Sequence, residues 1–279
     1  MRQLSPVTLS ADELARYARH VVLPEVGGAG QLRLTRASVA VVGAGGIGSP
    51  VIQYLAAAGT GRLIVIDEDR VEASNLQRQT LFATSDVGVA KAAQAAAAAA
   101  RLNPHVTVEP RVARLDAGNA AALLAGAEVV VDGCDNFATR LAVADAALAA
   151  RVPLVSAAVG RFEGQLGVFR GWEPGRPCYR CFVGDAPDRE GLTCAEEGVL
   201  GPVTGVLGSL AALEAIRQLV PFGDDSAGKL LVADLLSLRF RTLTLPKDPG
   251  CGCGATTDHP RSPGPEDRLS DSGDLSRRA

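Results

Sequence analysis

Histidine, aromatic residues and excess positive charge are all scarce in this chain of 279 residues. With a net charge of −3 at pH 7 and no run of basic residues, the sequence argues against a nucleic-acid partner. It contains no stretch of about eighteen apolar residues, and its N-terminus lacks the apolar region of a signal peptide. These absences predict a cytoplasmic protein without a membrane partner.

The composition is that of an ordinary globular protein. An apolar content of 47% and a charged content of 21% allow a sizeable core, and the length suits one large domain or two modest ones. Six cysteines occur, four of them in two close pairs. In a reducing compartment such pairs indicate metal or thiol chemistry more than disulfides.

The segment from Ser38 to Asp67 carries the strongest pattern: an apolar run, a glycine cluster, a helical run and a second apolar run. This order predicts a βαβ unit. Its helix, starting near Gly46, would direct free N–H groups at an anion such as a phosphate. Asp67 ends the second strand, where a carboxylate can accept hydrogen bonds from ribose hydroxyls. The pattern GxGxxG is completed by Gly43, Gly45 and Gly48. We therefore predict a nucleotide site, with NAD and ATP both left open.

Strand-length apolar runs and helical runs alternate through most of the chain. This alternation predicts an α/β fold with a doubly wound, Rossmann-like, mostly parallel sheet, to which we add antiparallel C-terminal strands. Further strands are expected at residues 106–112, 128–131, 153–157, 165–169, 229–234 and 240–245, and helices at 86–102, 119–124, 137–150 and 203–220. We divide the chain into a helical arm (1–30), a nucleotide-binding domain (31–175), a crossover loop with the last helix and strands of that domain (176–254), and a disordered tail (255–279).

The N-terminal arm begins with a capping box, Ser10 followed by Glu13, which predicts a helix over residues 11–20. This helix carries Arg19. Glycines at positions 27, 28 and 30 predict a hinge between the helix and the first strand. The helix could then reach across a site or a subunit boundary.

Charged and amide side chains collect where strands are expected to end, and ligands bind at that edge of open α/β sheets. They are Asp67, Asn75, Gln77, Arg78, Lys91, Asp135 and Asn136. A hydride-transfer site has little use for several cations. A reaction at a triphosphate needs cations on the phosphates and a carboxylate for Mg²⁺. Each residue singly could also belong to a surface ion pair.

A family resemblance rests on several strings in a fixed order. These are RYARHVVLPEVG, VGAGGIGSP, SNLQRQ, DGCDNFATR, GQLGVF, CYRC, GLTC and a terminal cysteine pair. From about Arg16 to Cys253 the chain resembles the ThiF/MoeB/HesA adenylyltransferases, bacterial relatives of ubiquitin-activating enzymes. The resemblance implies ATP-dependent activation of the C-terminal Gly-Gly carboxylate of a ubiquitin-like sulfur-carrier protein as an acyl-adenylate. The carrier could serve thiamine, molybdopterin or tRNA thiolation.

The resemblance also implies roles for individual residues. Gly46 would lie against the nucleotide and Asp67 would take the ribose, while Lys91 would stabilise charge on the phosphates. Arg19 matches an arginine that enters the neighbouring subunit's site, which implies a homodimer. The segment Ser74 to Arg78 would line the triphosphate site through Asn75, Gln77 and Arg78. Mg²⁺ and the adenylate would be held by Asp135 and Asn136.

The cysteines fall into three groups. Cys194 matches a family cysteine that in some members bonds covalently to the carrier; alternatively, it has no role in adenylation. Glu196 and Glu197 beside it would raise a thiol pKa. Cys134 is expected to be a packing residue. A structural zinc site would be formed by Cys178, Cys181, Cys251 and Cys253. The last pair is CxC where the family has CxxC, so free thiols remain an alternative, as does His259 as a substitute ligand.

Two rival functions make different demands on the sequence. An NAD-dependent oxidoreductase would need a catalytic histidine or a Tyr–Lys pair, and the histidines lie on the arm, before a strand and in the tail. A non-catalytic scaffold that binds a ubiquitin-like protein would be expected to have lost at least one of Arg19, Arg78, Lys91 and Asp135. If sulfur is transferred, an external donor is expected to supply it.

Overall fold

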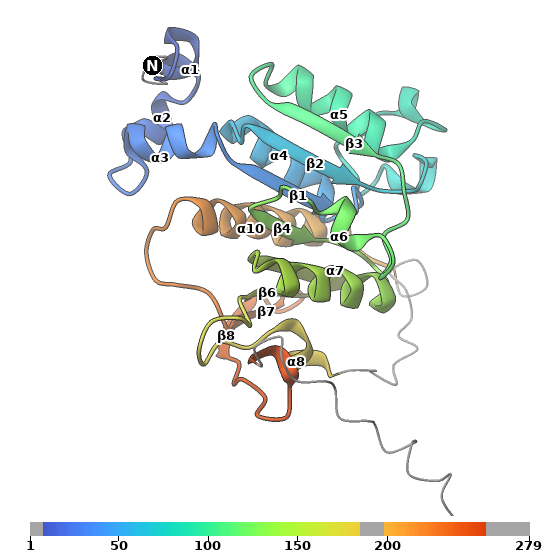
Figure 1. The fold of residues 1–279 in the computed structure, drawn as a ribbon. Helices are drawn as coiled ribbons and strands as arrows, with labels where there is room; N and C mark the ends of the chain where they lie inside the picture. Colours follow the sequence, from blue (N-terminus) through green and yellow to red (C-terminus); the bar gives the residue numbers. More distant parts are fainter. Residues whose placement is uncertain (1–7, 185–197, 255–279) are drawn as a thin grey trace, which may run out of the picture.

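The structure, a computed structural model, describes residues 8–184 and 198–254. Three predictions fall outside these ranges: Cys194, His259 and the tail at 255–279. Eight strands form one sheet in the order β3-β2-β1-β4-β5-β6-β7-β8 (Figure 1). They are β1 (Ser38–Val42), β2 (Arg62–Ile66), β3 (Thr107–Arg111), β4 (Val129–Asp132), β5 (Leu154–Gly160), β6 (Glu163–Phe169), β7 (Lys229–Asp234) and β8 (Arg239–Thr244).

The first five strands are parallel and the last three are antiparallel to their neighbours. The mostly parallel doubly wound core and the antiparallel C-terminal strands are therefore confirmed. Antiparallel pairing begins earlier than the two last strands, because β5 and β6 form a hairpin in which Gly160 pairs with Glu163. A two-residue connection leaves no room for the crossover helix that a parallel pair needs.

Helices cover both faces of the sheet. They are α1 (Ala11–Arg16), α2 (Ala18–Val21), α3 (Gly27–Leu34), α4 (Gly48–Ala58), α5 (Lys91–Leu102), α6 (Ala120–Leu123), α7 (Phe137–Ala150), α8 (Tyr179–Val183) and α10 (Gly201–Leu219). Short 3-10 turns lie at Ala73–Asn75, Thr84–Asp86 and Gly252–Gly254. The helix expected from residue 86 begins only at Lys91, after the turn at Thr84–Asp86. In the described ranges, no helix has the length and apolar character to cross a membrane.

The alternation of side chains along β1 divides the core into two layers. Val39 and Val41 pack with residues of α4, α5 and α10 on one face. Ala40 and Val42 pack with residues of α6 and α7 on the other. Because strand side chains alternate with a period of two, a fully apolar strand such as β1 can bury both faces. This arrangement leaves the ends of the strands as the places where polar groups can gather.

The predicted glycine hinge is wrong. Gly27–Leu34 forms the helix α3 instead of a flexible connection. Gly30 is needed there for packing, because a Cβ at this position would lie 2.8 Å from the Val220 side chain. The glycines therefore permit a close helix contact, which a sequence pattern cannot distinguish from a hinge.

The arm is anchored at the amino ends of the strands. Tyr17 is buried, and its hydroxyl accepts a hydrogen bond of 2.8 Å from Asn103 Nδ2. Arg16 donates a hydrogen bond of 3.0 Å to the carbonyl of Leu102, the last residue of α5. These contacts hold α1 and α2 against the body of the protein.

Candidate active site

A cleft of about 1140 Å³ opens at the carboxyl ends of the parallel strands. Val42, Ile66 and Gly133 lie on its walls, at the ends of β1, β2 and β4. From β1 the chain builds the sheet outward through β2 and β3 on one side, and it then returns to add β4 and β5 on the other side of β1. The cleft therefore lies where the strand order reverses, between β1 and β4. Open α/β sheets bind their ligands at this position.

The glycine loop forms the floor of the cleft. Gly43, Gly45 and Gly46 line it, and Gly43 has a φ of +88° that few other residues adopt. Gly48 allows the loop to close on itself, since a Cβ there would lie 1.8 Å from the Gly43 carbonyl oxygen. The helix α4 begins at this glycine, so its first N–H groups and the positive end of its dipole lie at the loop. The floor is suited to an anionic ligand.

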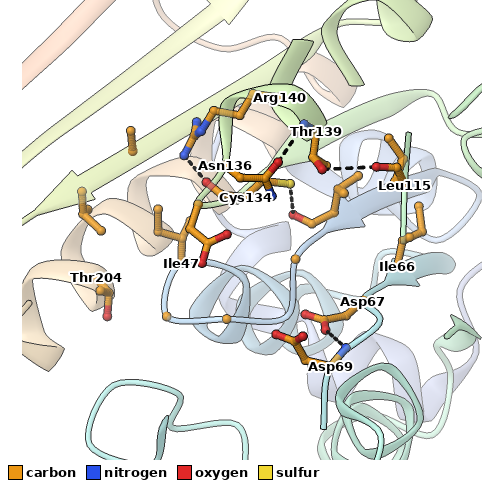
Figure 2. A pocket seen from close by; sticks show the side chains of 18 of the residues that line it. Ile47, Ile66, Asp67, Asp69, Leu115, Cys134, Asn136, Thr139, Arg140 and Thr204 are labelled. Carbon is orange, nitrogen blue, oxygen red and sulfur yellow. Dashed lines mark hydrogen bonds between the residues drawn. The ribbon is translucent and has the colours of Figure 1, made fainter. Parts of the chain in front are cut away.

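Asp67 stands at the end of β2 beside the loop (Figure 2). Its two carboxylate oxygens accept hydrogen bonds from the backbone N–H groups of Ala44 (2.7 Å) and Asp69 (2.8 Å). Each oxygen keeps a further lone pair, as ribose recognition requires. Burial raises the pKa of Asp67, and the nearby charge of Lys91 opposes this rise.

Lys91 is buried and forms an ion pair with Asp69, its Nζ lying 2.9 Å from the Asp69 carboxylate. Both side chains line the cleft. The sequence singled out Lys91 but missed Asp69, although Asp69 follows the same strand as Asp67 by two residues. The Lys91 ammonium group therefore lies in the cleft and is paired with the Asp69 carboxylate.

The SNLQRQ segment forms a turn, from which Asn75 and Arg78 face the cleft. Arg78 Nη1 donates to the Ser74 carbonyl (3.1 Å). The structure places Gln77 on the exposed side of this turn, outside the set of described residues that line the cleft. Gln79, which sequence reasoning missed, lines the cleft; it is 4% exposed, and its Oε1 has no hydrogen-bond partner within the described ranges.

A helical repeat, applied to the sequence of this turn, would have identified Gln79 as a residue that faces the cleft. The Gln79 N–H donates to the Asn75 carbonyl over 2.9 Å, so the turn has an i to i+4 repeat. Positions 75, 78 and 79 then share one side, and position 77 lies on the other. This period separates two glutamines that look equivalent in the sequence.

The turn after β4 carries Asp135 and Asn136 into the cleft. Asp135 is exposed there. Asn136 caps α7, because its side-chain oxygen accepts from the Thr139 N–H over 2.9 Å. Cys134 is buried, as expected for a packing residue, and burial raises the pKa of its thiol. In this turn Asp135 is thus the carboxylate that a ligand can reach.

Arg19 lies elsewhere. It is exposed on α2, which is held at the amino edge of the sheet, whereas the cleft opens at the carboxyl edge. The structure therefore does not bring Arg19 to the cleft of its own chain.

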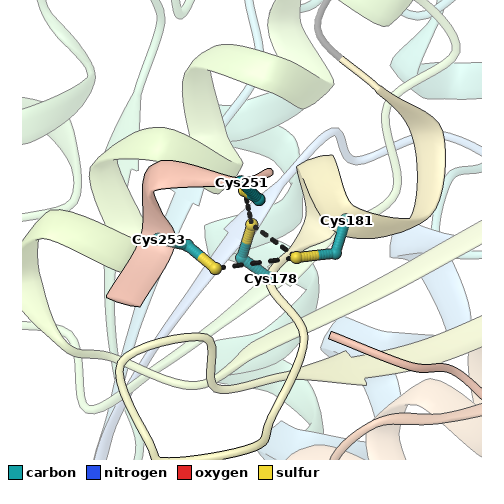
Figure 3. A group of neighbouring side chains, drawn as sticks. All are labelled: Cys178, Cys181, Cys251 and Cys253. Atoms are coloured by element: carbon teal, nitrogen blue, oxygen red, sulfur yellow. Dashed lines mark hydrogen bonds between the residues drawn. The ribbon is translucent and has the colours of Figure 1, made fainter. Parts of the chain in front are cut away.

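The four cysteines from the two pairs converge between α8 and the last turn (Figure 3). The Sγ atoms are 3.7 Å apart for Cys178 and Cys181, and 3.6 Å apart for Cys178 and Cys251 and for Cys181 and Cys253. A tetrahedral zinc ion with bonds of about 2.3 Å holds its sulfurs about 3.8 Å apart. The spacing and the donor set therefore fit zinc, and the CxC pair reaches the cluster.

Burial raises the pKa of two cluster thiols. That of Cys251 is raised to about 11, and that of Cys178 is raised further. These two thiols would be protonated near neutral pH without a cation. A bound metal would favour their thiolate forms.

Comparisons with known proteins agree with one another. The sequence model of the ThiF family matches residues 17–253. The sulfur carrier protein adenylyltransferase of Thermus thermophilus is 49% identical, over 87% of this chain and 92% of its own. The SAMP-activating enzyme E1 of Haloferax volcanii is 45% identical over 89% and 92%, and the molybdopterin-synthase adenylyltransferase of Escherichia coli is 43% identical over 88% and 98%.

Solved structures share the fold. Escherichia coli MccB with ATP superposes with a TM-score of 0.71 at 23% identity, covering 86% of this chain and 74% of MccB. PaaA gives a TM-score of 0.73 at 22% identity, covering 88% and 78%. At these identities the likeness concerns the fold alone.

Proposed function

This chain belongs to the ThiF family, and from that premise we propose that it is an ATP-dependent adenylyltransferase. Its substrate is the C-terminal Gly-Gly carboxylate of a ubiquitin-like sulfur-carrier protein. A carboxylate oxygen attacks the α-phosphorus of ATP, the bond from that phosphorus to the bridging oxygen breaks, and pyrophosphate leaves. The product is an acyl-adenylate, in which the carboxyl carbon is activated for a later attack.

One observation carries the proposal: a single cleft joins an anion-binding glycine loop with the groups that a triphosphate needs. Asp67 would accept the ribose hydroxyls, and Asn75 would lie beside the phosphates. Arg78 and Lys91 would stabilise the negative charge that develops on the leaving pyrophosphate. An oxidoreductase site has no need of this pair of cations.

Asp135, beside Asn136, would hold Mg²⁺, which supplies charge neutralisation between the phosphate oxygens when it is bound. The Asp135 carboxylate is exposed in the cleft and is not part of the core, so it is available to a cation. The volume of the cleft, about 1140 Å³, exceeds the roughly 300–1,000 Å³ usual for small-molecule sites. Space therefore remains for a peptide terminus beside the nucleotide.

We propose a homodimer in which Arg19 acts in the cleft of the partner subunit. The support is geometric, because Arg19 lies at the amino edge of its own sheet and is free of the cleft there. The contacts of Tyr17 and Arg16 hold the arm in place, so the arginine is presented on a rigid element. Because the arm is already rigid, less conformational entropy is lost when the two subunits assemble the site.

The cluster of Cys178, Cys181, Cys251 and Cys253 would hold a structural zinc ion. Such a site has no open coordination position and contributes to folding, not to the chemistry. A covalent role for Cys194, a cytoplasmic location and the absence of a nucleic-acid partner stay predictions from the sequence.

The proposed reaction is tested by ATP–pyrophosphate exchange with each Gly-Gly-ending carrier of the source organism. We expect exchange that requires Mg²⁺ and disappears when the last two glycines of the carrier are removed. Exchange with one carrier would name the pathway, and exchange with several would indicate a shared activator. Exchange with none would favour the scaffold function instead.

Gln79 and Gln77 offer a matched pair of variants in the same turn. Gln79→Ala removes a buried amide from the cleft and should raise the KM for ATP about tenfold, the effect of one lost hydrogen bond to a charged group. Gln77→Ala removes an exposed amide and should leave the KM within about twofold. Steady-state exchange at varied ATP measures both. Equal effects of the two variants would show that Gln79 does not contact the nucleotide.

A further inference from the structure

Tyr179 stands at a junction between the cysteine cluster and the cleft. It lies directly after Cys178 and two residues before Cys181, at the start of α8. Its ring is buried and packs edge-on against Phe169, with centroids 5.3 Å apart. The same side chain also lines the cleft. A movement of the cluster would therefore move this ring.

The polar end of Tyr179 meets a buried ion pair. Its side chain lines the same cleft as Arg140, from a helix that packs against α7, and the two groups influence each other's charge. Arg140 Nη1 lies 3.2 Å from the Asp132 carboxylate and donates to Ser156 Oγ over 3.3 Å. Ser156 in turn donates to Asp132 over 2.7 Å. Asp132, Arg140 and Ser156 thus form a closed network in which each member restricts the others, and Tyr179 lies against it.

The other side of the Arg140 guanidinium holds the backbone. Nη2 donates to the carbonyl of Cys134 and, over 3.0 Å, to the carbonyl of Ala157 in β5. Asp132 also fixes this turn, because its carboxylate accepts a hydrogen bond of 3.0 Å from the Cys134 N–H. Figure 2 labels Cys134 and Arg140, and Asp135 follows Cys134 in the sequence. The turn that presents Asp135 is thus fastened at both polar groups of the preceding residue.

We propose that Tyr179 and Arg140 are positioning residues, which connect the cysteine cluster to the turn that carries Asp135. The cluster then does more than close the fold: its geometry sets where the Asp135 carboxylate lies. This inference rests on the proposed function insofar as Asp135 serves the nucleotide. The mechanical link itself depends only on the contacts of Tyr179, Arg140 and Cys134.

Tyr179→Phe tests the link, since it removes the hydroxyl and keeps the ring. Hydrogen exchange of the backbone amides at residues 133–136 should accelerate at least about fivefold, because the Arg140 network loses the polar group that lies against it. In the pyrophosphate exchange reaction, the Mg²⁺ concentration for half-maximal rate should rise about tenfold. The metal content and the unfolding temperature should stay close to those of the unaltered protein.

Tyr54→Phe is the matched control, because it removes a tyrosine hydroxyl from an exposed position on α4. It should change neither hydrogen exchange at 133–136 nor the Mg²⁺ dependence. If Tyr179→Phe also leaves both unchanged, the link is overturned. If the unaltered protein shows no pyrophosphate exchange, the proposed function fails, and hydrogen exchange alone still decides the link.

Discussion

Asp135→Ala should reduce ATP–pyrophosphate exchange by at least about a hundredfold while the protein stays folded. The loss of a preorganised charged group at a reacting phosphate typically has this size. Asp135 is exposed and lies in a turn outside the two core layers, so its removal should cost little stability. Exchange rates and thermal unfolding measured on the same preparation check both statements. Retained exchange in a folded variant would show that Asp135 has no role in the reaction.

A subunit-mixing experiment provides the control and tests Arg19 as well. Arg19→Ala should also be inactive, because each cleft would lack the arginine of its neighbour. In a hybrid dimer of Asp135→Ala and Arg19→Ala subunits, one cleft has its own Asp135 and receives an intact Arg19 from the partner. Random mixing of a symmetric dimer should then restore about a quarter of the active sites. Failure to restore exchange would contradict the shared site.

The second large effect concerns the cysteine cluster. The purified protein should contain about one zinc per chain. Cys251→Ser should lose this metal and lower the unfolding temperature by roughly 10 °C or more, since a structural zinc site contributes several kcal/mol and about 1 kcal/mol corresponds to 2–4 °C at this size. Elemental analysis and thermal unfolding measure these outcomes.

Cys134→Ala supplies the comparison, because Cys134 is buried outside the cluster and should leave the zinc content at one per chain. A metal-free protein that unfolds cooperatively at high temperature would contradict a structural zinc site. So would an unchanged unfolding temperature in Cys251→Ser.

The βαβ unit could be predicted from the sequence because its determinants are local. A loop that needs a positive φ at Gly43 and close approach at Gly48 leaves a fixed glycine spacing, and Asp67 follows at the end of the next strand. Strand order and handedness then follow from general rules of α/β folds. These features do not depend on contacts between distant segments.

The features that the sequence did not predict arise from tertiary packing. The pairing of Lys91 with Asp69 joins residues 22 positions apart, and no local pattern encodes it. In the helix at Gly27–Leu34, Gly30 packs closely against Val220, which is distant in the sequence. Local propensity suggested a hinge there, and packing overrides such propensities.

The cysteine pairs fall between these cases. Their spacing predicted a cluster, and the structure brings all four sulfurs within 4.8 Å of one another. The position of Tyr179 beside Arg140 could not be predicted, because it depends on how α8 packs against α7. Sequence motifs therefore located the groups, whereas their connections required the structure.

The most direct test of the proposed function is the mass of the carrier protein after incubation with this enzyme, ATP and Mg²⁺. We expect a carrier that gains one AMP group, located at its C-terminal carboxylate and removed by added pyrophosphate. A carrier variant without its last two glycines should keep its original mass. An unchanged mass for every Gly-Gly-ending carrier, with folded enzyme and bound ATP, would contradict adenylation as the function.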